Sequence, residues 1–126
     1  MTRRADLLAR RALAALFSLV MVQSANAAES ELKPAFGNTI VSTHPDGRQA
    51  KLWLNRDRTY AAQGRKGQAS SGVWKVKGKK LCLSQRKPIS LPLSYCKAVP
   101  PVALGGRWSD IAVTGERVRN RVVRGK

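Results

Sequence analysis

The chain has 126 residues, which is enough for one domain and not for two. It contains 24 Lys and Arg against seven Asp and Glu, so its formal net charge at pH 7 is +17. A protein this basic attracts anionic polymers and anionic lipid surfaces, and electrostatic steering argues against a basic partner such as a lysozyme.

Residues 1–27 have the three parts of a cleavable signal peptide. Four arginines within residues 1–11 form the basic start, residues 12–22 are almost wholly apolar, and residues 25–27 (Ala-Asn-Ala) supply the small side chains that signal peptidase accepts. The alternative is a membrane anchor, but the apolar run is much shorter than the roughly 20 residues that span a bilayer. We therefore expect cleavage near Ala27, a periplasmic or secreted location and no transmembrane anchor after processing.

Cleavage would remove four of the basic residues and one acid, leaving 99 residues with a net charge of +14. The charge therefore belongs to the mature protein, where it serves either anion contact or solubility alone. Residues 28–35 show no clear pattern, and we expect a flexible start there, followed by a basic β domain at residues 36–126.

The mature chain alternates short β-branched and aromatic runs with turn signals such as Pro45-Asp46-Gly47 and Thr114-Gly115-Glu116. In the mature chain, no run of ten or more residues has helical periodicity without Gly or Pro. The pattern predicts an all-β fold, a small antiparallel meander of seven or eight strands closed into a barrel or sandwich and preceded by the signal-peptide helix. Residues 63–72 are expected to form a polar loop or a ragged hairpin end. The expected strands are residues 38–43, 49–54, 59–62, 73–77, 81–84, 89–97, 107–113 and 117–123.

Cys82 and Cys96 are the two cysteines of the chain. In an exported protein such a pair indicates a disulfide. Their spacing of 14 residues fits neither a CxxC redox motif nor a zinc site. Closing a loop of this length should stabilise the domain by about 3 kcal/mol.

No catalytic or metal-binding motif is present. His44 is the sole histidine and precedes Pro45 at an expected turn, so we interpret it as a surface turn residue. The carboxylates are scattered, and only the fold could bring together a glycosidase-type pair, with Asp110 and Glu116 as late candidates. Neither a metal-spaced cluster nor a Gly-rich phosphate loop occurs in the sequence. We expect a non-enzymatic protein without metal or cofactor.

Basic residues are the distinctive candidates for a binding site. Alternation with period two places Arg117, Arg119 and Arg121 on one strand face, opposite Val118 and Val122. Like charges at this spacing repel one another unless an anion neutralises them. The alternative is that these charges protect an edge strand from aggregation. The complete set of candidate anion-binding residues is Arg117, Arg119, Arg121, Arg124, Lys75 and Lys77.

A lysine-rich turn, Lys79-Lys80, follows the candidates Lys75 and Lys77, and solvation is the simplest explanation of this lysine group. The three tryptophans supply either core packing or exposed stacking surfaces. We expect Trp74 and Trp108 in the core, and Trp53, which shares a strand face with Lys51, to be the exception.

A series of short structural motifs gives the chain a resemblance to known proteins. The motifs, in order, are Gly37-Asn38-Thr39, Leu52-Trp53-Leu54, Asp57-Arg58-Thr59-Tyr60, Gly72-Val73-Trp74, Leu81-Cys82 and Tyr95-Cys96. The series resembles small exported proteobacterial proteins with a lipocalin-like or related small β-barrel fold, whose function is largely unknown. The resemblance implies that the cysteines pair across neighbouring strands, and it implies no activity. The chain departs from the pattern in its basic charge and its arginine-rich ending.

Three functions remain in competition. The first is a non-enzymatic envelope module, expected to be monomeric, that binds anionic polymers or anionic membrane surfaces through electrostatics. The second is a small-ligand carrier that uses a barrel interior, although 99 residues leave a narrow one. The third, a hydrolase with a carboxylate pair formed by the fold, is disfavoured by the absent motifs. A contiguous basic face would favour the first function, and an open apolar cavity would favour the second.

Overall fold

The computed structural model describes residues 23–126, so most of the predicted signal peptide lies outside the described residues. Two short helices, α1 (Gln23–Glu31) and the 3-10 helix η1 (Lys33–Ala35), precede the strands. The expected all-β class with antiparallel strands is confirmed. The strands are β1 (Thr39–Thr43), β2 (Gln49–Leu54), β3 (Thr59–Gln63), β4 (Ala69–Lys77), β5 (Lys80–Lys87), β6 (Tyr95–Ala98), β7 (Arg107–Ile111) and β8 (Arg117–Val123).

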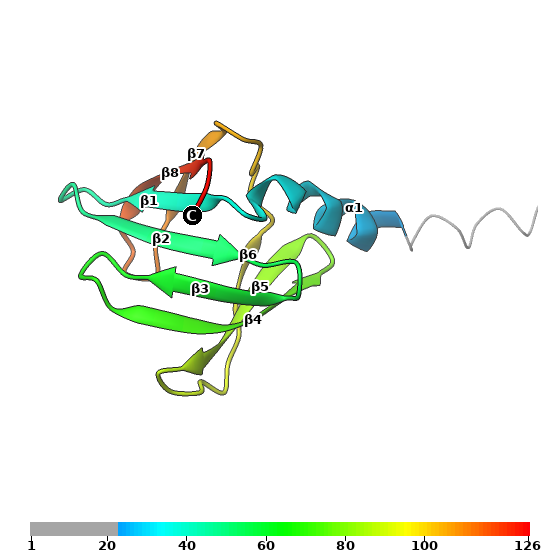
Figure 1. The fold of residues 1–126 in the computed structure, drawn as a ribbon, viewed down its shortest axis with the longest axis horizontal. Helices are drawn as coiled ribbons and strands as arrows, with labels where there is room; N and C mark the ends of the chain where they lie inside the picture. The colour runs from blue at the N-terminus through cyan, green and yellow to red at the C-terminus, as the bar shows by residue number, and fades with distance from the viewer. Residues whose placement is uncertain (1–22) are drawn as a thin grey trace, which may run out of the picture.

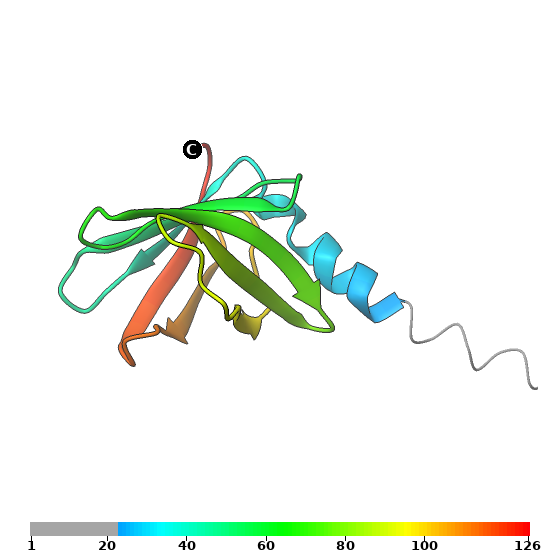
Figure 2. The same ribbon diagram turned by 90° about the horizontal axis from the view of Figure 1, so that it is seen from below.

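All eight described strands form a single sheet in the order β6-β5-β4-β3-β2-β1-β8-β7. The sheet curls into a half-barrel (Figures 1 and 2). The expectation of a closed barrel or sandwich is wrong, because β6 and β7 are edge strands that do not pair with each other. Both are short, at four and five residues, and the segment that joins them crosses one end of the curl instead of extending the sheet.

Several strand boundaries also differ from those expected. Residues 89–97 were expected to form one strand, but β6 begins only at Tyr95. Pro88 directly precedes that run and Pro92 interrupts it, and proline has no N–H to donate to a strand ladder. In contrast, β4 begins at Ala69 inside the expected polar loop, because residues 69–73 pair with β3 despite their polar composition.

The core lies at the end of the half-barrel that α1 and η1 cover. Leu32 and Ala35 are almost completely buried there with Leu54, Trp74 and Val102. The segment 28–35, expected to be a flexible start, forms the end of α1 and η1 and packs into the core. Its apolar residues are spaced one helical turn apart and fill the end of the curled sheet, which strands alone leave open.

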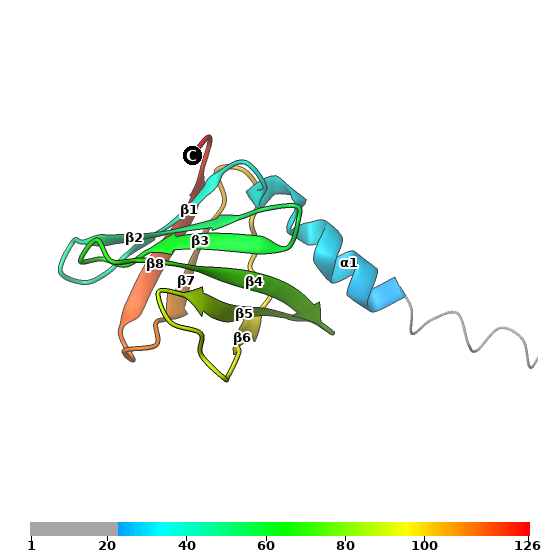
Figure 3. The ribbon, with the colours of Figure 1, turned by 60° about the horizontal axis from the view of Figure 1, so that its bottom comes forward.

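The opposite end of the half-barrel, called here the mouth end, carries the hairpin turns β1–β2, β3–β4 and β7–β8 and the β5–β6 loop. The register shows this arrangement, since Thr43, the last residue of β1, pairs with both Gln49 of β2 and Arg119 of β8. Alternate connections of an antiparallel meander lie at the same end. Figure 3 shows these connections away from α1.

Candidate functional site

A partly open groove of about 420 Å³ occupies the concave face of the half-barrel toward the mouth end. Its volume lies in the range of small-molecule sites, roughly 300–1,000 Å³. The groove is lined mainly by apolar side chains because most inward positions of β1, β2, β5 and β8 are apolar. These include Ile40, Leu52, Leu81, Leu83 and Val118, with Trp108 from β7.

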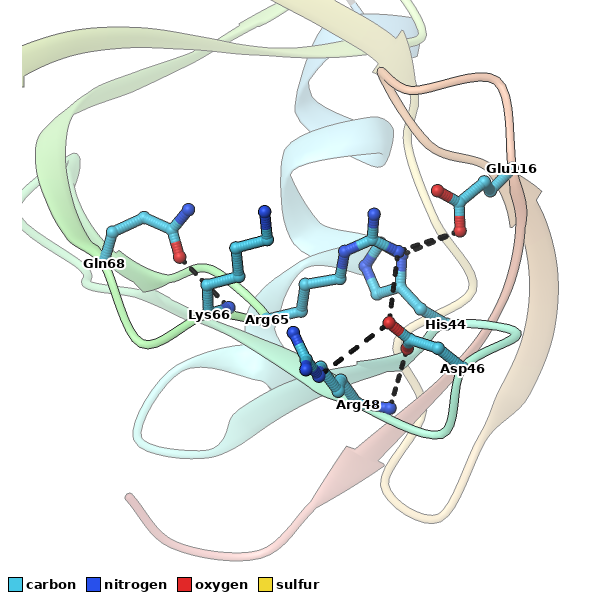
Figure 4. Close-up of polar contacts among 7 residues, drawn as sticks. All are labelled: His44, Asp46, Arg48, Arg65, Lys66, Gln68 and Glu116. Carbon is cyan, nitrogen blue, oxygen red and sulfur yellow. Dashed lines mark hydrogen bonds and ion pairs between the residues drawn. The ribbon is translucent and has the colours of Figure 1, made fainter.

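A polar cluster formed by three hairpin turns lies beside the groove (Figure 4). Arg65 of the β3–β4 turn donates a hydrogen bond of 2.9 Å to Glu116 of the β7–β8 turn. Arg65 also lies 3.8 Å from Asp46 of the β1–β2 turn. The hydrogen bond from Arg65 lowers the pKa of Glu116 and raises that of Arg65, so both groups stay charged near neutral pH. The pKa of Asp46 is also lowered, first by the backbone N–H of Arg48.

His44 belongs to this cluster. It was expected to be a surface turn residue, but its side chain is only 11% exposed and it lines the groove. Its Nδ1 atom lies 3.2 Å from Arg65 and 3.8 Å from Glu116. Within residues 23–126, the hydrogen-bond contact of the ring is therefore with a cation and not with a nucleophile.

Lys97 of β6 and Asp110 of β7 bridge the two sheet edges. Lys97 Nζ lies 2.7 Å from Asp110 Oδ2 and also donates to the carbonyl of Ile111. Burial raises the pKa of Asp110. The hydrogen bonds from Lys97 and the Ile111 N–H, together with the charge of Lys97, lower it by more, so the net shift is downward. Burial lowers the pKa of Lys97, but the neighbouring Asp110 and Tyr95 together raise it by more, so the net shift is upward. The charged residues that line the groove, Arg65, Lys97 and Asp110, thus have partners within the protein.

The arginines of β8 lie on the opposite, outer face. Arg117, Arg119 and Arg121 are exposed, and they alternate with buried Val118, Asn120 and Val122. The expected alternation along this strand is therefore present. It arises because the valines face the concave side and pack against the groove and the core.

Arg107, which sequence reasoning did not single out, completes a basic hollow with Arg119 and Arg121. Arg107 of β7 is directly opposite Arg121 in the register, so both side chains lie on the outer face. The hollow has a volume of about 410 Å³. Its other polar lining residues are Thr43, Gln49, Ser109 and Asn120. No ion pair involves the three arginines in the part of the chain described here.

The remaining candidate residues lie elsewhere. Lys75 and Lys77 are exposed on β4, which β3, β2 and β1 separate from β8. Arg124 is exposed just after β8, near the α1 end of the half-barrel. The structure therefore joins Arg119 and Arg121 with Arg107 and keeps the lysines apart from them. Alternation along the expected strand at 107–113 is the signal that could have placed Arg107 on an outward face.

The three tryptophans occupy different environments. Trp74 is buried in the core, as expected, and its Nε1 donates to the Asn55 carbonyl at 2.8 Å. Trp108 packs against the core and lines the groove, and is only half-buried. Trp53 is half-buried on the outer face and donates to Thr39 Oγ1 at 2.8 Å.

The expected disulfide between Cys82 and Cys96 is present, and it joins opposed residues of β5 and β6. Among residues 23–126, no group of His, Cys, Asp and Glu is arranged to hold a metal ion. The same region contains no helix of sufficient length and apolar character to cross a membrane. Comparisons of the chain with protein-family models, with curated proteins and with solved structures gave no match.

Proposed function

We propose that this protein is an exported binding module that contacts anionic polymers or anionic surfaces through the outer face of β7 and β8. The observation that carries the proposal is the basic hollow, where Arg107, Arg119 and Arg121 converge without a carboxylate partner among the described residues. Like charges placed directly opposite one another on a sheet are destabilising, and a bound anion relieves that repulsion.

The position of β8 in the sheet argues against the alternative explanation of its charge. Charged side chains protect a sheet from aggregation when they lie on an edge strand. β8 lies between β1 and β7 and is not an edge strand. Edge protection therefore does not account for Arg117, Arg119 and Arg121, which favours anion contact.

The test is the salt dependence of binding to duplex DNA, heparin and anionic vesicles. Each phosphate contact on a duplex contributes about −0.9 to the slope of log K against log salt concentration. We expect Arg119→Gln/Arg121→Gln to flatten this slope on DNA by about 1.8. Glutamine is chosen because it removes the charge but keeps an aliphatic stem. Buried Val41 lies opposite Lys51 and Arg121, and the long stems of these two side chains flank it.

The matched control removes two charges elsewhere, through Lys79→Gln/Lys80→Gln in the β4–β5 hairpin. We expect this control to flatten the slope by less than about 0.9, the value for one contact. Equal effects of the two double variants would show that net charge, not the hollow, governs binding. Failure to bind any of the three anions at low salt would refute the proposal.

A second candidate function, transport of a small ligand, is favoured by the apolar groove. Because Arg65, Lys97 and Asp110 are already paired, the groove is best matched by an uncharged and mainly apolar ligand. We expect the neutral fluorophore N-phenyl-1-naphthylamine to bind, and Ala50→Phe to weaken its binding at least about tenfold by filling the groove. The control is Ala61→Phe, on the outer face of β3. Equal affinity of the wild type and Ala50→Phe would exclude this site.

We also propose a periplasmic or secreted location for the protein. The disulfide between Cys82 and Cys96 supports it, because disulfides persist mainly in oxidising compartments.

A further inference from the structure

The β5–β6 loop, residues 88–94, exposes an unusual amount of aliphatic surface. Ile89 is 65% exposed, Leu91 is 43% exposed and Leu93 is 80% exposed. Single exposed aliphatic residues are common, but a group of them in one short loop marks an interaction site. Two exposed basic residues, Arg86 and Lys87, immediately precede the loop.

Hydrogen bonds hold this loop in position. The Leu91 N–H donates to the Gln85 carbonyl at 3.1 Å, and the Gln85 side chain donates to the Ile89 carbonyl at 3.1 Å. At the base of the loop, the hydroxyl groups of Ser84 and Ser94 are 2.6 Å apart. The loop therefore presents its aliphatic side chains with a fixed backbone, which lowers the entropic cost of binding.

The same end of the molecule carries further aliphatic and basic side chains. Val113 in the β7–β8 turn is 79% exposed. Lys66 in the β3–β4 turn and Arg117 at the start of β8 are also exposed. None of Arg86, Lys87, Lys66 and Arg117 forms an ion pair within the described residues. Aliphatic side chains among unpaired cations match the interface of an anionic bilayer.

We propose that the β5–β6 loop inserts its aliphatic side chains into the interface of an anionic lipid membrane, with Arg86 and Lys87 contacting the headgroups. This inference rests on the proposed function and selects the membrane, instead of a polymer, as the partner of the mouth end. A dissolved polyanion makes no use of exposed Ile89 and Leu93, whereas a bilayer buries them. The open groove then lies at the membrane-facing end of the molecule.

The test is cosedimentation of the purified protein with vesicles of phosphatidylglycerol and phosphatidylcholine, with pure phosphatidylcholine vesicles and heparin as comparisons. We expect Ile89→Ser/Leu91→Ser/Leu93→Ser to lower binding to the anionic vesicles at least about tenfold, because each side chain loses its apolar transfer energy. Heparin binding should stay within about twofold, since the charges are retained. Arg119→Gln/Arg121→Gln should show the reverse preference and weaken heparin binding more.

A second measurement keeps the proposal testable if the triple variant fails to fold. Relative to the wild type, Leu93→Trp should gain a blue-shifted emission with anionic vesicles and quenching by brominated lipids. Three results would overturn the loop proposal and leave the proposed function standing: unchanged vesicle binding of the triple variant, heparin binding without vesicle binding, or no added quenching in Leu93→Trp. A wild-type dimer that the triple variant abolishes would also overturn it, because the loop would then bind a second copy. Absence of binding to both vesicles and heparin would refute both proposals.

Discussion

Four hairpin turns share a residue with positive φ at the same position. These residues are Gly47, Arg58, Gly67 and Gly115, with φ between 70° and 87°. Each turn has the same pair of backbone hydrogen bonds, which is typical of a three-residue hairpin loop ending in a left-handed residue. Arg58 is the one residue of these four that is not glycine. Its guanidinium lies over the Trp74 ring and pairs with Glu29 of α1 at 2.5 Å. These contacts offset the conformational strain and attach the helix to the sheet.

Gly72 occupies a position where the backbone of the neighbouring strand leaves no room for a side chain. It is buried in β4 beside a register shift, and a Cβ there would lie 2.0 Å from the Ser84 carbonyl oxygen of β5. We expect Gly72→Ala to lower the free energy of unfolding by about 1–3 kcal/mol, because backbone must move to admit the methyl group. Chemical denaturation measures this change.

The control for this prediction is Gly64→Ala. The three heavy atoms nearest to a Cβ at Gly64 all belong to the side chain of Gln68, which is flexible and exposed. We expect a change within about 0.5 kcal/mol. A similar loss of stability for both variants would contradict the close approach of β4 and β5 at Gly72.

At the scale of elements, β6 depends on the disulfide. It has four residues and, among the described strands, pairs with β5 alone, and so short an edge strand gains little from its own hydrogen bonds. The bond from Cys96 to Cys82 joins it to an eight-residue strand. β6 in turn carries Tyr95 and Lys97, which line the groove.

We expect Cys82→Ala/Cys96→Ala to lower the free energy of unfolding by about 3 kcal/mol, because the unfolded chain regains the entropy that the closed loop removed. Alanine is chosen because Cys82 is buried and a serine hydroxyl would need a partner there. Chemical denaturation with and without reductant is the measurement, and the reduced wild type should match the variant. Two titratable thiols in the unreduced protein would contradict the bond.

At the scale of the whole molecule, the half-barrel separates apolar from charged surface. The concave groove is apolar with paired charges, whereas the outer face carries the arginines of β7 and β8, which form no ion pair among residues 23–126. The Lys97–Asp110 pair connects the two sheet edges and so bounds the groove. Its contribution depends on pH because the pKa values of both groups are shifted in the folded protein.

The pKa of Asp110 is lowered from 3.8, so the stability it contributes is present above that value and is lost as the pH falls through the lowered pKa. The pKa of Lys97 is raised from 10.5, so its contribution is lost as the pH rises through the raised value. We expect Asp110→Asn to cost no more than about 1 kcal/mol near neutral pH, since the pair is partly exposed and screened.

Denaturation of wild type and Asp110→Asn across the pH range checks this expectation. The difference between the two proteins should disappear in strong acid, where Asp110 is protonated in both the folded and unfolded states. A difference that persists unchanged in strong acid would show that the carboxylate charge does not stabilise the contact between β6 and β7. Raised salt at neutral pH should also reduce the difference.

The sequence by itself determined the features that depend on local pattern. Alternation along the chain placed the arginines of β8 on one face and Val118 and Val122 on the other, and turn residues predicted the strand number and the antiparallel class. The cysteine spacing and the signal-peptide pattern together predicted the disulfide. These predictions succeeded because strand periodicity and turn chemistry act over a few neighbouring residues.

Only the tertiary structure decided whether the sheet closes, what fills its ends and which charges meet. Leu32 enters the core, Arg107 lies opposite Arg121, and Arg65 reaches Glu116 across 51 positions of the chain. Each of these contacts depends on the curl and register of the whole sheet, which many distant pairings set together. No local periodicity encodes them, because a side chain's strand face can be predicted from its neighbours in sequence whereas its contact partner cannot.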